Sequence, residues 1–310
     1  MRIYILSRNE ELYSTRRLVE EAKGKDWEVR VIDYLKCTIE IMKNELVINY
    51  EGKILPTPDA IIPRIGASRT FYGTAMVRHF EMMDVFSTSG NLAIARSRDK
   101  LRSLQVLSKK GVDMPKTIFA SNKSNAKDVI ALSGGAPLVL KILEGTQGVG
   151  VVLVDSEKAA KSVLDAFYGM EVNLLVQEFI EEAGGADIRA LVVNDEVVGA
   201  MKRQGAEGDF RSNLHQGGSA TAYKLSRKEK ATALAAAKAM GLGVCGVDMI
   251  PSKRGPLVME VNSSPGLEGI EKSTNINIAA KIMDFIEKSV KPKCPINPQK
   301  RKLKKDKIGA

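Results

Sequence analysis

The sequence has few of the residues on which several common kinds of site depend. It contains only 3 cysteines and 2 histidines in 310 residues. Cys37, Cys245 and Cys294 have neither the spacing of a disulfide framework nor that of a metal-ligand set, which favours a reducing, cytoplasmic location. With His79 and His215 as its histidines, the chain cannot build a histidine-rich zinc site.

Long apolar runs are also lacking. No run approaches the roughly 20 apolar residues that a membrane-spanning helix needs. The stretch 1–6 reads as a buried strand and lacks the longer apolar region and cleavage site of a signal peptide. We therefore expect no membrane association. An apolar fraction of 44% and a charged fraction of 27% are typical of a globular protein, here long enough for two or three domains.

The net charge of +10 is concentrated at the C-terminal end. Residues 291–310 contain eight Lys or Arg residues against one acidic residue, Asp306, which is a net +7. Residues 1–290 therefore carry only +3, so the body of the chain is mildly basic. Because the tail also contains three prolines, we expect it to be a disordered extension.

The first third of the chain has a β-α-β pattern. Residues 3–7 and 29–33 read as strands, and a helical pattern lies between them at 11–23. This start is typical of an open α/β domain. A further buried strand at 60–66 places Arg64 where parallel strands end and present ligand contacts. A surface arginine on a loop explains Arg64 equally well.

A second unit carries two lysines in unusual places. Lys100 falls in the first turn of a predicted helix, where a cation opposes the helix dipole. Lys141 ends the almost wholly apolar strand 137–141, and a lysine in that position needs a counter-charge. A phosphate would serve both lysines, although an ordinary solvated lysine would also explain Lys100.

A glycine-rich loop follows Lys141. It reads EGTQGVG at 144–150 and joins one strand to another, so it is neither a P-loop nor a GxGxxG motif that opens a helix. Glycines let a turn bring several backbone N–H groups close to an anion. A plain hairpin turn explains such a loop about as often, but the neighbouring lysine favours a phosphate-binding flap.

Two later stretches suit a nucleotide and its substrate. The apolar strand 174–180 ends in Gln-Glu, and its backbone edge could pair with an adenine edge. The loop 206–218 is polar and rich in glycine, and it follows Arg203. Such a loop suits a substrate or phosphate clamp.

A predicted hairpin of strands 246–250 and 257–262 gathers oxygen ligands. Glu260 and Asn262 are two residues apart and so share a strand face, and in simple register Asp248 lies opposite them. Two carboxylates at this spacing repel each other unless a cation lies between them. Mg²⁺ prefers such ligands together with phosphates. Taken alone, this pattern favours an exposed polar face, but the phosphate-binding features elsewhere favour a metal site.

Taken in order, these motifs resemble the ATP-grasp superfamily of carboxylate–amine ligases and, within it, the RimK family. The resemblance covers residues 1–290 and rests on IPRIG at 62–66, SRDKLRS at 97–103, EGTQGVGV at 144–151, GDFRSNLH at 208–215 and PGLEGIEK at 265–272. It implies an ATP-grasp fold of the α/β (α+β) class. The expected parts are an N-terminal open α/β domain at 1–95, a small central lid domain at 96–180, a C-terminal antiparallel-sheet domain at 181–290 and the basic tail at 291–310.

The resemblance implies a set of ATP-binding residues, namely Lys100, Lys141, Glu178, Phe179, Asp187, Arg211, Ser212 and Asn213. The two lysines would contact phosphates, and Asp187 would hold the ribose hydroxyls. Glu178 and Phe179 would present their backbone to adenine. The three residues 211–213 would lie at the nucleotide and acyl-phosphate side.

The resemblance also implies the metal ligands and catalytic residues. Asp248, Glu260 and Asn262 would bind Mg²⁺ or Mn²⁺, with two ions expected. Arg203 and Arg211 would act in catalysis, and Arg203 would steady an acyl phosphate. The cofactors implied are ATP and these ions.

The activity implied is ATP-dependent α-L-glutamate ligation, with release of ADP and phosphate through an acyl phosphate. The family adds glutamate to the C-terminus of small-subunit ribosomal protein number six, and poly-α-glutamate is a further expected product. We expect L-glutamate and that C-terminus as partners, weak electrostatic association of the tail with the ribosome, and a homo-oligomer. Two alternatives stay open: a related ATP-grasp ligase acting on a small peptide or an amino-group carrier protein, and a non-catalytic protein that binds ATP or nucleic acid.

Overall fold

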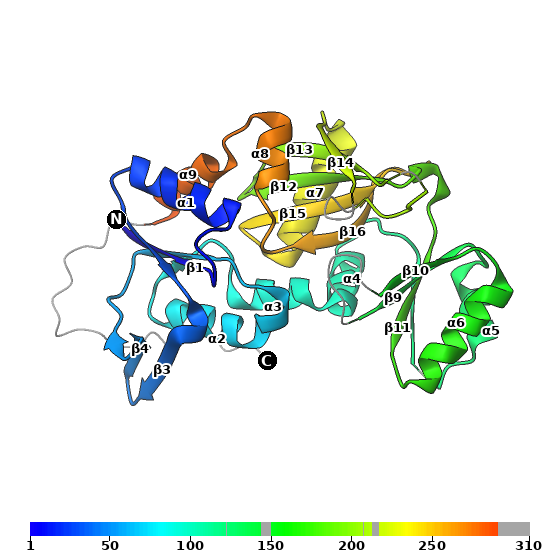
Figure 1. The fold of residues 1–310 in the computed structure, drawn as a ribbon, viewed down its shortest axis with the longest axis horizontal. Coiled ribbons are helices and arrows are strands. Elements are labelled where there is room, and N and C mark those ends of the chain that lie inside the picture. The colour runs from blue at the N-terminus through cyan, green and yellow to red at the C-terminus, as the bar shows by residue number, and fades with distance from the viewer. Residues whose placement is uncertain (122, 144–149, 207, 213–216, 291–310) are drawn as a thin grey trace.

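The computed structural model describes residues 1–121, 123–143, 150–206, 208–212 and 217–290. Figure 1 shows the helices and strands of these residues in three groups, the N-terminal part, a central unit and the C-terminal part. In this part of the chain, no helix is long and apolar enough to cross a membrane. Short 3₁₀ helices join larger elements at η1 (Tyr34–Lys36), η2 (Ala67–Arg69) and η3 (Glu181–Ala183).

A parallel sheet begins the chain. Its strands lie in the order β2-β1-β6-β7, with bounds β1 (Arg2–Leu6), β2 (Glu28–Ile32), β6 (Ala60–Pro63) and β7 (Phe86–Ser87). Ile3 to Leu6 are fully buried, as expected for a parallel strand covered on both faces. Leu6 pairs with Pro63, so β1 and β6 end at the same edge of the sheet. Arg8 and Arg64 follow directly at that edge.

Helices cover both faces of this sheet. Ile3 and Ile5 pack in one cluster with Leu18 and Ala22 of the first helix, whereas Tyr4 and Leu6 pack on the other face with the second helix. The helices of this region are α1 (Tyr13–Gly24), α2 (Thr70–Met82), α3 (Asn91–Arg98) and α4 (Lys100–Lys109). A small antiparallel sheet lies beside them and contains β3 (Cys37–Met42), β4 (Glu45–Tyr50) and β5 (Lys53–Ile54).

The central unit is an antiparallel sheet with two helices. Its strands lie in the order β10-β9-β11-β8, with bounds β8 (Thr117–Ala120), β9 (Leu138–Ile142), β10 (Val151–Val154) and β11 (Leu174–Glu178). Side chains of Asn125 and Ser156 accept backbone hydrogen bonds and so start α5 (Ala126–Ser133) and α6 (Glu157–Gly169). Figure 1 shows this unit projecting from the rest of the molecule.

The C-terminal part is built on a five-stranded antiparallel sheet of order β14-β13-β12-β15-β16. Its strands are β12 (Ala186–Val193), β13 (Glu196–Gln204), β14 (Ser219–Ala222), β15 (Val244–Ile250) and β16 (Leu257–Asn262). Its helices are α7 (Arg227–Met240), α8 (Glu268–Thr274) and α9 (Ile278–Ser289). Helix α7 begins with a complete capping box between Ser226 and Glu229 and ends at Gly241 in the left-handed conformation.

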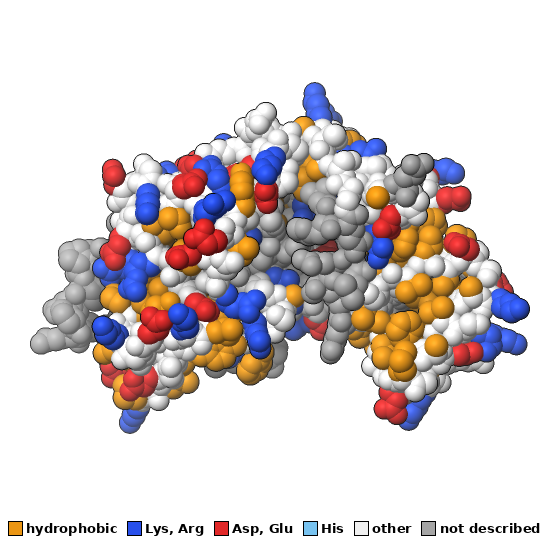
Figure 2. Space-filling view, in the orientation of Figure 1, with side chains coloured by type: hydrophobic (Ala, Val, Ile, Leu, Met, Phe, Trp, Pro, Cys, Tyr) orange, Lys and Arg blue, Asp and Glu red, His pale blue; other side chains and the backbone are white. Residues whose placement is uncertain are grey.

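The hydrophobic cores join the first and last parts and leave the central unit separate. Two clusters each combine side chains of the N-terminal and C-terminal sheets, whereas a third contains residues of the central unit alone. On the face drawn in Figure 2, apolar side chains gather on the central unit, and charges of both signs cover the N-terminal part. The two terminal sheets are therefore packed as one body, to which the central unit is attached.

Candidate functional site

A row of charged side chains crosses the C-terminal sheet. Asp187 and Arg189 are two residues apart on β12 and so share a face. Asp187 pairs in register with Arg203 on β13, and Arg189 pairs with Asp248 on β15. Asp248 in turn lies opposite Glu260 on β16. Strand pairing therefore places five charged residues side by side, with basic and acidic groups largely alternating.

Hydrogen bonds tie this row together. Arg203 donates from Nε to Asp187 Oδ1 at 2.6 Å and from Nη2 to Asp187 Oδ2, and the same Nη2 lies 2.9 Å from Asp248 Oδ2. Arg189 donates to both oxygens of Asp248. All four side chains are at most 15% exposed. Buried ion pairs of this kind hold their partners in fixed geometry, because leaving either charge unpaired is costly.

The three carboxyl groups have different proton affinities. Burial alone would raise the pKa of Asp248, but the charges and hydrogen bonds of Arg189 and Arg203 outweigh it and hold that pKa well below its usual range. Burial raises the pKa of Asp187 despite its bond to Arg203. The pKa of Glu260 is also raised, first by loss of surrounding water and second by the negative charge of Asp248, although solvent still reaches its side chain.

Two lysines from other elements lie within electrostatic reach of Glu260. Lys100, the first residue of α4, donates from Nζ to the carbonyl oxygens of Ile142 and Leu143 at 3.0 and 3.1 Å. Lys141 on β9 donates to Gln177 Oε1 at 2.6 Å. Burial lowers the pKa of both ammonium groups, that of Lys141 to about 8, and the charge of Glu260 opposes this shift in each.

The predicted adenine contacts lie at the end of β11. The backbone N–H of Glu178 donates to the Lys116 carbonyl oxygen at 3.0 Å, and its carboxylate is paired with Arg254. The Phe179 ring meets Phe210 edge to face, with centroids 6.3 Å apart. The second aromatic ring comes from the loop after β13, so strand end and loop lie together.

The loop after β13 carries the remaining predicted residues. Arg211 is paired with Asp209, with Nη2 2.9 Å from Oδ2, and Ser212 is buried. Asn213 lies outside the described residues. The loop folds closely over Gly205, where a Cβ atom would lie 2.4 Å from the Arg211 carbonyl oxygen. Glycine at this position is therefore required for the observed path of the loop.

The oxygen donors of the hairpin fit a hard cation in part. Asp248 and Glu260 face each other on neighbouring strands, and Asn262 is two residues from Glu260. The amide oxygen of Asn262 accepts a hydrogen bond from Ser264 N at 2.9 Å, which orients the side chain. Among the described residues no three His, Cys, Asp or Glu side chains form a metal cluster. Two carboxylates and an amide oxygen suit Mg²⁺ when phosphate oxygens complete its coordination.

Sequence reasoning missed two partners in this site. Arg189 binds Asp248 directly, and its position two residues after Asp187 in a strand was the available signal. Gln177 holds Lys141 through a bond between strands that no local pattern reveals.

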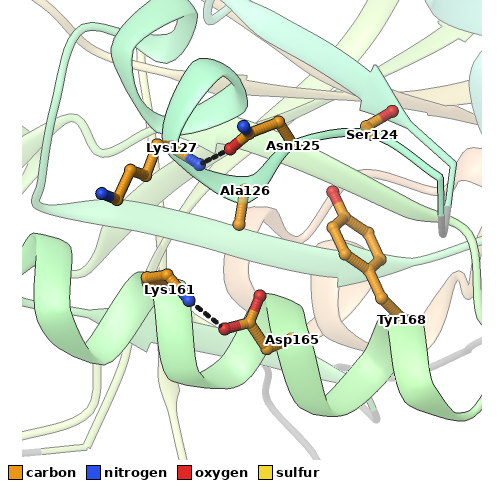
Figure 3. Close-up of a pocket in the computed structure, with 7 residues that line it drawn as sticks. All are labelled: Ser124, Asn125, Ala126, Lys127, Lys161, Asp165 and Tyr168. Carbon is orange, nitrogen blue, oxygen red and sulfur yellow. Dashed lines mark hydrogen bonds and ion pairs between the residues drawn. The ribbon is translucent and has the colours of Figure 1, made fainter.

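A separate hollow of about 510 Å³ lies in the central unit. Figure 3 shows its lining, which comes from the start of α5 and from α6, and includes Lys127, Lys161 and Tyr168. None of the residues predicted from the sequence to bind ATP or metal lines it.

Comparisons with known proteins agree along nearly the whole chain. Residues 1–94 match the RimK PreATP-grasp domain, and residues 97–286 match the RimK-like ATP-grasp domain. Proteins named probable alpha-L-glutamate ligase from Saccharophagus degradans and Shewanella loihica are each 61% identical over 292 residues, which is 94% of this chain and 97% of theirs.

Solved structures share the fold at low sequence identity. The ATP-grasp ligase PsnB complexed with its minimal precursor superposes with a TM-score of 0.73 at 18% identity, covering 94% of this chain and 98% of that one. The RimK domain protein ATP-grasp from Sphaerobacter thermophilus gives a TM-score of 0.69 at 19% identity, covering 92% and 99%. At these identities the likeness shows the fold alone.

Proposed function

We propose a specific reaction for this chain, which belongs to the RimK family of ATP-grasp ligases and is an ATP-dependent ligase that forms C–N bonds. In this reaction L-glutamate is joined through its amino group to the C-terminal carboxylate of a peptide or protein. The observation that carries the proposal is the charged row on the C-terminal sheet, with Asp248 and Glu260 face to face and Lys100 and Lys141 close enough to respond to Glu260.

The proposed reaction proceeds in two steps. The acceptor carboxylate attacks the γ-phosphorus of ATP, which forms an acyl phosphate and releases ADP. The amino group of glutamate then attacks the acyl carbon, loses a proton and displaces phosphate. Because the phosphoryl group carries the chemistry, the main tasks of the protein are positioning and charge neutralisation.

The residues predicted from the sequence have these roles in the proposal. Lys100 and Lys141 bind phosphate oxygens, and Arg203 steadies the acyl phosphate from its fixed place beside Asp187. Asp187 also holds the ribose, while the backbone of Glu178 and Phe179 faces adenine. Arg211, Ser212 and Asn213 close the nucleotide side from the loop after β13, and Arg211 assists catalysis.

Asp248, Glu260 and Asn262 would hold Mg²⁺ or Mn²⁺, with two ions expected. Such ions supply charge neutralisation for the phosphates of ATP. A structure of PsnB contains Mg and ADP, which supports this choice by fold similarity. A second reason is that a cation beside the two carboxylates would relieve the repulsion by Asp248, which after burial is the next cause of the raised pKa of Glu260.

We propose the same division of the chain as the sequence suggested, with 1–95 as the N-terminal domain, 96–180 as a lid, 181–290 as the catalytic part and 291–310 as a tail outside the described residues. The separate hydrophobic cluster of the central unit supports its role as a lid. The strands and helices of the central unit can move without opening the cores that the terminal sheets share, although Leu107 and Val112 of the 96–180 range pack in one of those cores.

The finer assignment concerns the acceptor. We propose the C-terminus of small-subunit ribosomal protein number six, with poly-α-glutamate as a further product and a homo-oligomer as the active form. Proteins named probable alpha-L-glutamate ligase that are 61% identical to this chain support glutamate as the amino substrate. The free, buried Cys37 and Cys245 support a cytoplasmic location.

Product analysis tests this function. Purified protein is incubated with ATP, Mg²⁺, L-glutamate and one acceptor: the ribosomal protein, a small peptide or an amino-group carrier protein. The masses of the products are then measured by mass spectrometry. We expect glutamate additions on the ribosomal protein, with ADP and phosphate in equal amounts. AMP and pyrophosphate would exclude an acyl phosphate, and modification of another acceptor alone would reassign the substrate.

A matched pair of variants tests the metal assignment. Asp248→Asn and Glu260→Gln keep the shape of each side chain and remove its charge, so we expect at least a hundredfold loss of ligation with either. Asn262→Ala removes a neutral ligand that water can replace, and we expect a smaller loss. Near-normal turnover in either carboxylate variant would refute the assignment.

A further inference from the structure

Three arginines gather at one edge of the N-terminal sheet. Arg8 and Arg64 follow the adjacent parallel strands β1 and β6, which end together at that edge. Arg98, the last residue of α3, donates from Nη2 to the Ile65 carbonyl oxygen at 2.7 Å. Arg8 Nη2 lies 3.9 Å from the place that a Cβ atom on Gly66 would take. Ligands of open α/β sheets commonly bind at this edge.

The described part of the protein gives these arginines no ion-pair partner. No carboxylate among the described residues forms an ion pair with Arg8, Arg64 or Arg98. The Nε atom of Arg98 is buried and has no hydrogen-bond partner there. Burial lowers the pKa of Arg64 to about 10, and the like charge of Arg98 adds to this effect. Arg64 and Arg98 are half-buried, and removing cations from water without a counter-charge is costly, so a bound anion would lower that cost.

Arg98 connects the cluster with the reaction site. The negative charge of Glu260 reaches Arg98 and partly offsets the lowering of its pKa, as it does for Lys100 and Lys141. Arg98 and Lys100 are separated only by Asp99, and helices α3 and α4 both contact β16. Lys100, Lys141 and Arg98 therefore all lie within electrostatic reach of Glu260.

We infer that Arg64 and Arg98, with Arg8 at the rim, bind a carboxylate of the substrate that takes no part in bond formation. This inference rests on the proposed glutamate ligation. Guanidinium groups match the planar geometry of a carboxylate and bind it through paired hydrogen bonds. Two sources have this chemistry, the incoming glutamate and acidic residues near the C-terminus of the acceptor. In either case the cluster selects acidic substrates.

The test uses Arg64→Gln and, as a control, Arg78→Gln, which changes an exposed arginine on α2 of the same part. The Michaelis constants for L-glutamate, acceptor and ATP are measured separately. We expect Arg64→Gln to raise KM for one carboxylate substrate by about 10- to 100-fold, the range for a hydrogen bond to a charged group. A rise for glutamate identifies the amino substrate as the source, and a rise for the acceptor identifies its acidic residues. KM for ATP stays within twofold.

Thermal stability separates binding from a structural role. Arg64→Gln removes a half-buried charge without an ion-pair partner, so its melting temperature without substrate should equal or exceed that of the wild type. Arg64→Lys keeps the charge and should recover part of the lost affinity. A lower melting temperature with unchanged KM values for glutamate and acceptor would overturn the inference.

A binding measurement keeps this test apart from the proposed function. Failure of the wild-type protein to ligate glutamate would refute the proposed function itself. Calorimetric titration with L-glutamate and with an acidic acceptor peptide, in the presence of ADP and Mg²⁺, then tests the cluster without turnover. Loss of binding in Arg64→Gln but not in Arg78→Gln supports the inference. Equal binding by both variants, or none by the wild type, overturns it.

Discussion

Arg189 donates two hydrogen bonds to Asp248, from Nε to Oδ1 at 2.7 Å and from Nη2 to Oδ2 at 2.6 Å. Asp248 is also a proposed metal ligand, so an arginine and a metal ion would share its oxygens. A carboxylate offers about four lone-pair positions, which is enough for both if one contact loosens. Arg189 therefore neutralises the charge of Asp248 and competes with a metal ion for its oxygens.

The first prediction follows from this shared carboxylate. In Arg189→Gln, Asp248 keeps its bond to Arg203 but loses its main cation, so Mn²⁺ should bind several times more tightly without nucleotide. The free energy of unfolding should fall by about 1–3 kcal/mol, less than for a fully broken buried pair because Arg203 remains. Calorimetry and urea unfolding measure the two effects. Arg227→Gln, which changes an exposed arginine, is the control, and unchanged Mn²⁺ affinity in Arg189→Gln would contradict the idea.

Part of this site could be predicted because strand geometry is local. The alternation of strand residues predicted Asp248 opposite Glu260 if the hairpin paired in simple register; the two residues do pair, but only because the register shifts between Asp248 and Met249. The bulge beyond Asp248, where Met259 is skipped in the pairing, was not predictable from the residue pattern. The helix predicted to begin at Lys100 is α4, and Asp99 caps it by accepting a hydrogen bond from the backbone N–H of Arg102.

Other features depend on contacts between distant segments. The pairing of Arg203 with Asp187 requires β12 and β13 to align in one register, which the sequence alone does not specify. The shared cores of the first and last sheets could not be foreseen either, because the residues concerned look like ordinary buried positions of two separate domains. The glycine-rich loop at 144–149 and the tail lie outside the described residues.

Gly246 leaves room for Arg189, which gives the second prediction. A Cβ atom at this position would lie 3.1 Å from Pro265 Cβ and 3.6 Å from Arg189 Nε. Gly246→Ala should therefore lower the free energy of unfolding by about 1–3 kcal/mol through overpacking, and disturb the Arg189–Asp248 pair. Gly266→Ala is the matched control, because no atom of the described residues other than its chain neighbours lies within 4 Å of its Cβ position. Equal urea midpoints for the two variants would show that a methyl group at position 246 fits beside Pro265 and Arg189 without overpacking.

The third prediction concerns the tail, which carries eight basic residues. Truncation after Val290 should leave KM for L-glutamate and turnover nearly unchanged, because the active-site residues proposed here all precede it. KM for an anionic acceptor such as the ribosome should rise at low salt, and this difference should shrink as salt screens exposed charges beyond about 8 Å. Loss of ATP turnover at every salt concentration would instead make the tail part of the folded enzyme.

The last prediction uses the lowered pKa of Lys141, which burial brings to about 8, with a smaller contribution from the charge of Lys100. Below pH 8 the ammonium is charged and attracts ATP phosphates, whereas above it the free enzyme loses that charge. The value of kcat/KM for ATP reports the free enzyme, so it should fall by about tenfold per pH unit above pH 8. Lys141→Arg keeps its charge, so its kcat/KM for ATP should no longer fall above pH 8, even if its absolute activity is lower.

Stability should respond to the same group in the opposite sense. Because the folded pKa lies below the ordinary lysine value of 10.5, the unfolded chain binds more protons between pH 8 and pH 10.5. The contribution of Lys141 to the free energy of unfolding therefore rises with pH across that window, and Lys141→Met should abolish this rise. Urea unfolding at pH 7.5 and pH 9.5 measures the difference between the two proteins. A wild-type pH dependence that Lys141→Met retains in full would assign the titration to another group.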